Sequence, residues 1–461
     1  MAFQATASTD YDELFAYLEK KILEERCEAR VAFPPESASD TLLFSCFQAF
    51  IDKYKAALDE VSYGFASHEV RFLPRERAAD LSEEKHYDAL ASTYDSDYYL
   101  TDCGGHDTFR ASGGTMLDSR LGSLFDLIDP REEDSILDVG CGRGELSYQL
   151  SKFCRKVTAV DYSKDAIRIA KETYAKLSTE DRLQYSCTDI LTMPDTASFD
   201  KIVLADVYEH IDADVMEKLL PKLRDMMAEG GKLFVHTAPN LDWYEKVYPK
   251  QRREALRQRR YLPKNPRSYY EKLMHINEQS SRSLHDTLAR YFGDVIVWNG
   301  TVPGMEDFND FTGVPRENDI FAVASRSSLQ PFKEGLFMQP VTDGSLRFRL
   351  SVLAPPAPIL QGLTGTIPLR VTNLSPVPVR SQNPCPVNLS YHVLSESGET
   401  VLFDGVRTRL PKTLYPGEQA DCLLEFDGEP LERGRYTLQI SLVQEQVAWL
   451  EETVSCPVEV R

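Results

Sequence analysis

Three stretches of the chain differ in how apolar and polar residues alternate. The first, residues 10–75, follows a helical period: in the segment 10–25, Leu14, Leu18 and Ile22 fall on one face, with charged residues opposite. A second helical pattern covers 41–61. These patterns predict an N-terminal helical region, and we assign residues 1–115 to this region together with an irregular, aromatic cap at 87–114.

In the second stretch, residues 116–330, short β-rich runs alternate with helical patterns such as 164–178 and 214–228. The alternation predicts an α/β fold in which a mostly parallel, Rossmann-like sheet is covered on both faces by helices. The predicted strands are 135–138, 156–161, 183–188, 201–205, 232–237, 295–298 and 320–324.

The third stretch, residues 341–461, is rich in proline and turn signals, for example at 354–358, 375–378 and 415–417. Short alternating runs lie between these turns. Regular short strands separated by turns predict an all-β sandwich domain of roughly seven strands.

Composition and charge exclude several classes of partner. The 461 residues include 72 acidic and 52 basic side chains, which gives a formal charge of −20. Such a surface repels phosphate backbones and anionic lipids, so we expect no nucleic-acid partner. No apolar run reaches the ~18 residues of a membrane span, so we expect no membrane insertion. Nine cysteines without a C-x-x-C pair, and no secretory signal, predict a cytoplasmic protein.

The strongest chemical signal is the glycine-rich loop after the strand at 135–138. Gly140, Gly142 and Gly144 allow a tight turn that a ligand can approach closely, and a helix follows at once. The next strand ends at Asp161, where a carboxylate can accept hydrogen bonds from the hydroxyls of a ribose. A nicotinamide dinucleotide is the competing ligand, but its G-x-G-x-x-G spacing differs from the G-x-G-x-G found here.

With these features, residues 116–325 resemble class I S-adenosylmethionine-dependent methyltransferases. The matching motifs are 136–144, 160–163, 188–190, 205–211 and 229–233. The resemblance implies that the glycine loop holds the methionine part of S-adenosyl-L-methionine, that Asp161 binds the ribose and Asp189 the adenine, and that Asp206 lies beneath the methyl group. The cofactor-binding residues implied in this way are Asp138, Gly140, Gly142, Gly144, Asp161, Tyr162, Asp189, Ile190 and Asp206.

The same resemblance supplies candidates for catalysis. If a helix begins after the fourth strand, Asp206 and His210 share one face at i, i+4. The pattern at 206–210 also resembles ubiquinone-pathway and small-RNA O-methyltransferases, in which such residues bind a divalent metal, and His275 matches a further ligand of the RNA enzymes. We therefore name Glu209, His210 and His275 as catalytic candidates. A histidine that serves as general base is the first hypothesis and a divalent metal the second.

The acceptor is expected to lie against an insertion at 239–290, which is rich in tyrosine and arginine and favours an anionic ligand. Segments of the third stretch, among them 388–392, 403–411 and 442–449, together with residues 87–325, resemble bacterial polysaccharide-biosynthesis methyltransferases with a C-terminal β-sandwich. This resemblance implies a carbohydrate acceptor. Tyr391, His392 and Trp449 of the C-terminal domain are candidate glycan contacts. A homo-oligomer or a glycan-assembly partner would also bind through this domain. The alternatives are a small-molecule methyltransferase and a non-catalytic cofactor-binding scaffold.

Overall fold

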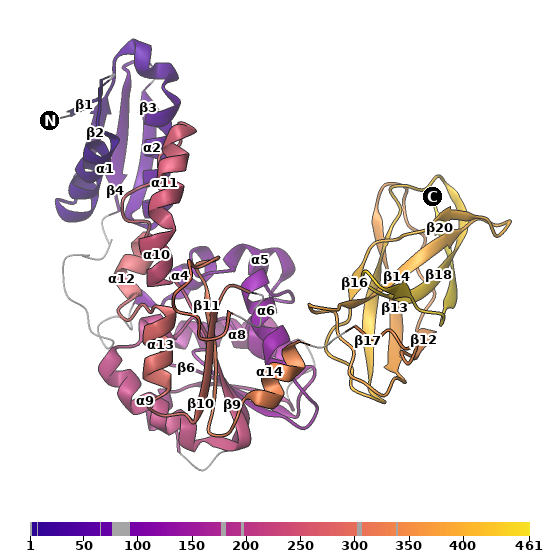
Figure 1. Cartoon of the computed structure of the whole chain (residues 1–461). Helices are drawn as coiled ribbons and strands as arrows, with labels where there is room; N and C mark the ends of the chain where they lie inside the picture. The colour runs from indigo at the N-terminus through magenta and orange to yellow at the C-terminus, as the bar shows by residue number, and fades with distance from the viewer. Residues whose placement is uncertain are drawn as a thin grey trace. The chain divides into compact units, whose positions relative to one another are not determined.

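A computed structural model describes residues 2–6, 8–64, 66–75, 93–176, 181–194, 198–301, 307–337 and 340–461. Part of the expected cap, residues 87–92, lies outside this set. The chain divides into two compact units, one of Met1–Leu124 with Glu132–Leu329 and one of Phe125–Arg131 with Gln330–Arg461 (Figure 1). None of the described helices combines the length and apolar character that crossing a bilayer requires.

The first unit is organised around a seven-stranded sheet of order β10-β11-β9-β8-β5-β6-β7. Strands β5 to β9 pair in parallel, and β11 runs antiparallel to both of its neighbours. This is the Rossmann-like α/β fold that the sequence predicts, and all seven predicted strands are confirmed. Their bounds are β5 Ser135–Val139, β6 Lys156–Asp161, β7 Leu183–Cys187, β8 Phe199–Ala205, β9 Met227–Thr237, β10 Asp294–Asn299 and β11 Ile320–Ser325.

Helices pack against this sheet because its central strands are apolar on both faces. Ile202, Val203 and Leu204 of β8 are consecutive and all fully buried, as expected of a parallel strand covered on both sides. Helix α9 contributes Leu219, Leu220 and Leu223 to the same core. The helices nearest the sheet in sequence are α6 Ser119–Ile128, α7 Glu145–Ser151, α8 Lys164–Tyr174, α9 Ala213–Asp225 and α13 Ser281–Leu288.

The N-terminal region is mixed rather than helical, so that part of the prediction was wrong. Helices are present in both predicted ranges, although residues 58–61 of the second range belong to a strand, and they accompany a four-stranded sheet of order β1-β2-β4-β3. The missed strands are short: in β4, only Val70 and Phe72 give the alternating burial that marks a strand. The elements are β1 Phe3–Gln4, α1 Tyr11–Glu19, η1 Lys20–Glu24, β2 Ala29–Ala32, η2 Pro35–Ser39, α2 Thr41–Tyr54, η3 Lys55–Ala57, β3 Leu58–Gly64 and β4 Glu69–Pro74.

The insertion after β9 packs against this N-terminal region. Tyr261 and Tyr269 are buried in one core with Phe15 and Phe50, so these tyrosines serve packing. Arg252 pairs with the carboxylate of Asp12 across the same contact. The helices of the insertion and of the cap are α10 Leu241–Lys246, α11 Tyr248–Arg257, α12 Tyr269–Met274, α4 Ser96–Thr101 and α5 His106–Ser112.

The second unit begins with α14 (Gln330–Leu336) and has the all-β character that the sequence predicts. Its described strands form a three-stranded sheet, β12-β13-β17, and a six-stranded sheet built on β14 and β18, with antiparallel pairing throughout. Side chains of both sheets, such as Leu369 and Leu389, meet in one core. The strands are β12 Phe348–Val352, β13 Thr364–Asn373, β14 Val387–Leu394, β15 Thr400–Leu402, β16 Thr408–Arg409, β17 Gln419–Asp427, β18 Gly434–Gln444, β19 Ala448–Trp449 and β20 Val454–Val460.

Candidate active site

The glycine loop between β5 and α7 is a turn that needs glycine. Gly140, Gly142 and Gly144 have φ values of 71°, 52° and 85°, which side-chain-bearing residues rarely adopt. A Cβ on Gly140 would lie 2.4 Å from a methyl carbon of Val207, and one on Gly144 would lie 2.5 Å from the hydroxyl of Tyr185. The glycines therefore allow both the turn and the close packing of its neighbours.

The loop is held to the end of β6 by Asp161. One carboxylate oxygen accepts a hydrogen bond of 2.9 Å from the backbone N–H of Gly142, and the other accepts one of 2.8 Å from the backbone N–H of Ser163. Burial raises the pKa of Asp161 to about 6, although these two bonds oppose the shift. The neighbouring Asp138 is also buried, and its pKa is raised to about 6 while it accepts from the Ser147 hydroxyl.

A cavity of about 450 Å³ opens beside this loop. Nearly all of the sequence-predicted site residues line it, including Asp189, which follows β7 and caps η5 (Ile190–Thr192). Gly144 does not line the cavity; it packs against Tyr185 instead. The predicted residues that the cavity brings together are Asp138, Gly140, Gly142, Asp161, Tyr162, Asp189, Ile190, Asp206, Glu209, His210 and His275.

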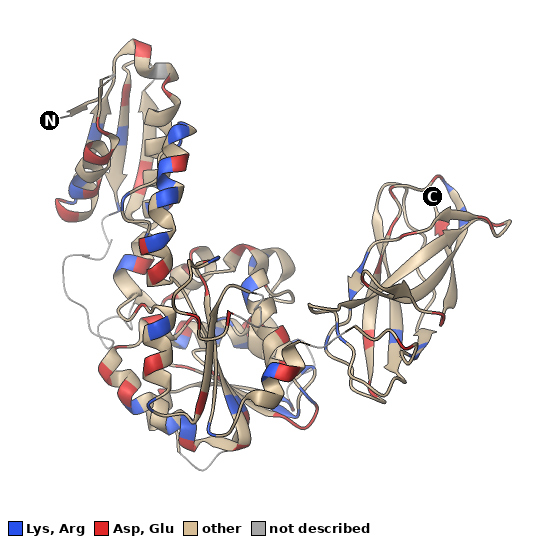
Figure 2. Cartoon of the chain, in the orientation of Figure 1, with Lys and Arg blue, Asp and Glu red and all other residues tan. Residues whose placement is uncertain are grey.

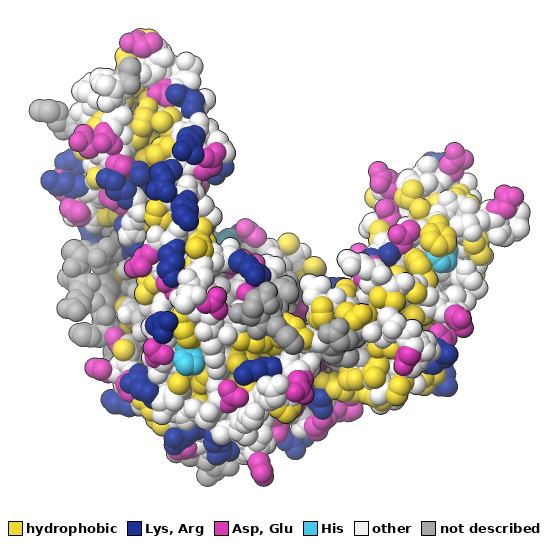
Figure 3. Space-filling model, in the orientation of Figure 1, with side chains coloured by type: hydrophobic (Ala, Val, Ile, Leu, Met, Phe, Trp, Pro, Cys, Tyr) yellow, Lys and Arg dark blue, Asp and Glu magenta, His cyan; other side chains and the backbone are white. Residues whose placement is uncertain are grey.

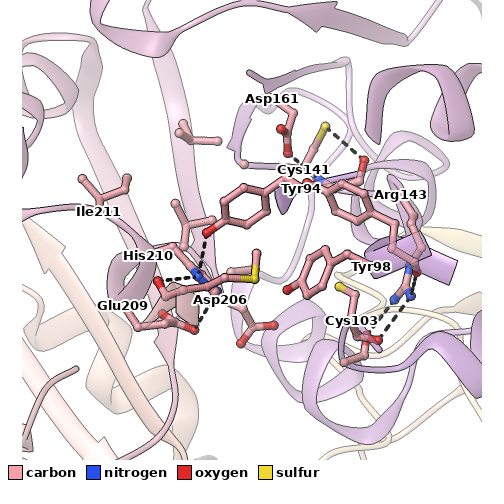
Figure 4. A pocket seen from close by; sticks show the side chains of 18 of the residues that line it. Tyr94, Tyr98, Cys103, Cys141, Arg143, Asp161, Asp206, Glu209, His210 and Ile211 are labelled. Atoms are coloured by element: carbon pink, nitrogen blue, oxygen red, sulfur yellow. Dashed lines mark hydrogen bonds and ion pairs between the residues drawn. The ribbon is translucent and has the colours of Figure 1, made fainter. Parts of the chain in front are cut away.

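The described part of the cap, from residue 93 onward, forms another wall of the cavity. Tyr94 is almost fully buried, and its ring lies between Asp161 and His210 (Figure 4). Arg143, which sequence reasoning missed, fastens the cap to the glycine loop. Its guanidinium donates to the carbonyls of Tyr99 and Gly104 and pairs with Glu145. A buried arginine inside a glycine loop gives no signal in the sequence, because the carbonyls that it contacts in the cap are 39 to 44 residues away.

On the opposite side of the cavity, Glu209, His210 and His275 form one cluster. Their ligand-type atoms all lie within 4.8 Å of one another. The two imidazole rings meet edge to face with centroids 4.7 Å apart. Glu209 and His210 belong to the short 3-10 helix η6 (Tyr208–His210), and His275 follows α12. The structure thus brings together the three catalytic candidates, which are up to 66 positions apart in the sequence.

His210 is neutral in this setting. Burial, and then the neighbouring His275, lower the pKa of His210 to about 3. Its Nδ1 lies 2.9 Å from the Tyr94 hydroxyl and 3.3 Å from the carbonyl oxygen of Met274. Because a carbonyl only accepts, we place the proton on Nδ1, which leaves the Nε2 lone pair available.

The pKa values of the other two members of the cluster, Glu209 and His275, are both shifted upward. Burial, reinforced by the charge of Asp206, raises the pKa of Glu209 to about 7, while the Thr237 hydroxyl donates to its carboxylate at 2.7 Å. Burial lowers the pKa of His275, but Glu278 and Glu209 outweigh this effect, so that the net shift is upward.

Asp206 is held away from this cluster by a buried charge network. It has a φ of 55° and starts no α-helix, so the expected i, i+4 face shared with His210 does not form. Its carboxylate lies 2.5 Å from Nδ1 of His236 in β9 and 2.9 Å from Arg120.

The network continues from His236 to Asp319, whose carboxylate lies 3.0 Å from Nε2. Burial raises the pKa of Asp206, but Arg120 and His236 overcome this effect and hold it well below its usual range. Burial likewise lowers the pKa of His236, and the two carboxylates overcome it and raise that pKa to about 9. The sequence gives no sign of these partners of His236, because they come from separate elements.

Comparison with known proteins relates part of this cavity to a family of domains. Residues 136–231, from β5 to β9, match the model of a family described as "Methyltransferase domain". The chain contains a methyltransferase domain. The match includes the glycine loop, Asp161 and the segment 206–210, and it ends before His236 and His275.

Relatives of the methyltransferase domain cover part of the chain. The mitochondrial ubiquinone biosynthesis O-methyltransferase of Saccharomyces cerevisiae is 32% identical over 129 residues, which is 26% of this chain and 39% of that protein. Sphingolipid C9-methyltransferase 1 of Gibberella zeae is 25% identical over 125 residues, or 27% of this chain and 24% of that protein. In both cases, this chain matches less than two thirds of the relative's length.

Solved structures give the same picture of partial similarity. The N-methyltransferase NodS of Bradyrhizobium japonicum, in complex with S-adenosyl-L-homocysteine, is 17% identical with a TM-score of 0.30, and covers 52% of this chain and 96% of its own. The DhpI–SAH complex is 16% identical with a TM-score of 0.33, and covers 52% and 98%.

The cluster of Glu209, His210 and His275 has a donor set that fits a divalent cation. It offers one carboxylate and two imidazoles, and Asp206 is not part of it because Arg120 and His236 engage its carboxylate. The Nδ1 atom of His210 contacts a backbone carbonyl, and the Nδ1 atom of His275 lies 3.5 Å from a carboxylate oxygen. In each histidine, this is the ring nitrogen that would face away from an ion. Such outer contacts are typical of metal-binding histidines. Two imidazoles favour Mn²⁺ or Zn²⁺ over Mg²⁺.

Proposed function

We propose that this protein is an S-adenosyl-L-methionine-dependent methyltransferase that methylates a hydroxyl oxygen. One observation carries the proposal: a single cavity has the glycine loop, Asp161 and Asp189 on one side and the cluster of Glu209, His210 and His275 on the other. A donor and an acceptor bound on these two sides would meet inside it. Methyl transfer is an in-line displacement, which depends on alignment and on exclusion of water.

The donor side supplies binding and orientation. The carboxylate of Asp161 accepts hydrogen bonds from the two ribose hydroxyls. The hydrogen bonds that it accepts from the backbone N–H groups of Gly142 and Ser163 hold it in place. Asp189 contacts the adenine. The open backbone of Gly142 lets the amino-acid part of the donor approach, since an added Cβ would contact only the Tyr99 ring, at 3.6 Å. Arg143 donates to the carbonyl of Tyr99, and the Ser163 hydroxyl donates to the carbonyl of Tyr94. The two tyrosines cover the donor from water.

The acceptor side must take up the hydroxyl proton. A histidine base was the first hypothesis, but a pKa near 3 makes His210 a weak base at neutral pH. Glu209, with its pKa raised to about 7, is better matched to that task. If Glu209, His210 and His275 hold a divalent cation, the cation lowers the pKa of the acceptor hydroxyl. Unchanged turnover in excess chelator would support Glu209 alone; loss that Mn²⁺ restores would support the metal.

The acceptor that we propose is a carbohydrate, either a polysaccharide or a nucleotide-linked sugar. An aromatic cluster in the second unit supports this choice: His392 stacks on the exposed Phe403 at 4.5 Å and lies 4.1 Å from Trp449. Tyr391, also named from the sequence, is fully buried and contributes to the core instead. The names of the relatives favour a second candidate, a phenolic or lipid small molecule.

The test is a transfer assay with methyl-labelled donor against sugars, nucleotide-linked sugars and phenols, followed by mass analysis of the product. We expect label on a sugar oxygen, and no label with the Asp161→Asn variant. Label only on phenols would support the second candidate. Donor uptake without turnover on any acceptor would instead support a cofactor-binding scaffold.

A further inference from the structure

The first unit has a second hollow, of about 600 Å³, outside the cavity described above. It lies between α10, α11 and the segment 264–267, and no residue lines both hollows. We call it the insertion groove. The side chains that define it are Tyr244, Tyr248, Arg252, Arg253, Lys264 and Arg267.

The insertion groove is lined by four basic side chains and one acidic one, Glu245, and it lies in the most basic segment of an acidic chain. Residues 250–267 contain eight lysines and arginines and one acidic residue, Glu254, whereas the whole chain has a charge of −20. Figure 2 shows blue bands along α11, interrupted by tan and red, and Figure 3 shows dark blue side chains gathered over the same part of the molecule. A local field of this sign attracts anions despite the net charge.

Nearby carboxylates neutralise only part of this charge. Asp12 pairs with Arg252 and lies 3.4 Å from Lys264, and Glu278 pairs with Arg267. Arg253 is exposed on the groove and makes no ion pair or hydrogen bond with any residue that the structure describes. Lys264 is also largely exposed, so two cations face the groove from opposite walls.

The walls of the groove are fixed before any ligand binds. The Tyr248 hydroxyl donates to the carbonyl of Pro263 at 2.7 Å, which ties α11 to the facing segment. The guanidinium of Arg267 lies 4.5 Å from the centre of the Tyr244 ring. Aromatic surface next to fixed cations suits a ligand that combines a planar or sugar ring with an anionic group.

The groove also adjoins the candidate active site along the chain. Arg267 lines the groove, whereas the next residue, Ser268, lines the cavity, as do Tyr270 and Glu271. Consecutive Cα atoms are about 3.8 Å apart, so the two hollows share a wall. One acceptor molecule could therefore place a hydroxyl at the Glu209 cluster and an anionic end in the groove.

We propose that the insertion groove binds the diphosphate of a nucleoside diphosphate-linked sugar, the methyl acceptor; this rests on the proposed function. Arg253 and Lys264 contact phosphate oxygens, while Tyr244 and Tyr248 contact the nucleoside. A volume of about 600 Å³ is of the size that ligands of this kind occupy.

The test uses the full chain with uridine diphosphate and inorganic pyrophosphate as probes, measured by calorimetry at low salt without any methyl donor. We expect both probes to bind. Arg253→Glu and Lys264→Glu should each weaken binding at least tenfold. Arg257→Glu is the matched control, because Arg257 is exposed on the same helix outside the groove, and it should change affinity less than twofold.

The affinity for S-adenosyl-L-homocysteine, measured in parallel, should be the same in all four proteins. If wild type fails to bind this compound, the proposed function is wrong. Binding of uridine diphosphate and pyrophosphate tests the proposal for the groove separately. Equal affinity for uridine diphosphate in Arg253→Glu and Arg257→Glu would overturn the proposal that the groove binds a diphosphate. So would wild-type binding of uridine as tightly as of its diphosphate, or binding of an acidic polysaccharide with neither probe bound.

Discussion

The fully buried His236, which lies between the carboxylates of Asp206 and Asp319, makes stability depend on pH in a defined way. Both ring nitrogens face a carboxylate oxygen, at 2.5 Å from Asp206 and 3.0 Å from Asp319, so both carry protons in the folded protein. The folded pKa, about 9, lies above the unfolded value near 6.5. Stabilisation by the imidazolium is therefore complete below pH 6.5 and is lost as pH rises through 9. The difference between the folded and unfolded pKa values corresponds to about 3 kcal/mol of unfolding free energy.

The assay compares wild type with His236→Gln by chemical denaturation from pH 6.5 to 9.5, following the transition of the first unit. The variant keeps a hydrogen-bonding side chain but cannot be charged. Wild type should lose about 3 kcal/mol more of its unfolding free energy than the variant over this range. All other groups that titrate there are present in both proteins and cancel in the difference. Parallel pH profiles would refute the assignment of a charged His236.

Three further predictions concern the glycine loop and its supports. Asp161→Asn should weaken S-adenosyl-L-homocysteine binding about 10- to 100-fold, and wild-type affinity should fall below pH 6 as this carboxylate is protonated; calorimetry showing equal affinity at pH 5 and 7.5 would contradict this. Gly140→Ala should lower the unfolding free energy by about 1–3 kcal/mol more than the control Gly113→Ala. Gly113 also has a positive φ, but a Cβ there would meet open space. Arg143→Gln should speed hydrogen exchange at residues 99–104, and unchanged protection there would argue against its anchoring role.

The central sheet and the donor loop could be predicted from the sequence because their determinants are local. A parallel strand buried on both faces is a continuous apolar run, as in β8, and needs no knowledge of its neighbours. Glycines that need positive φ stand next to the strand that they follow. The short N-terminal strands escaped prediction because four to seven residues beside strong helical patterns carry little periodic signal.

The chemistry of the acceptor side depended on the tertiary structure. Residue types suggested Glu209, His210 and His275, but their protonation follows from burial and from neighbours such as Tyr94, 116 positions away from His210. Asp206 matched a ligand pattern in the sequence, yet Arg120 and His236 withdraw its carboxylate from the cluster. Charge interactions depend on distance and on exclusion of water, and both are set only when remote segments pack together.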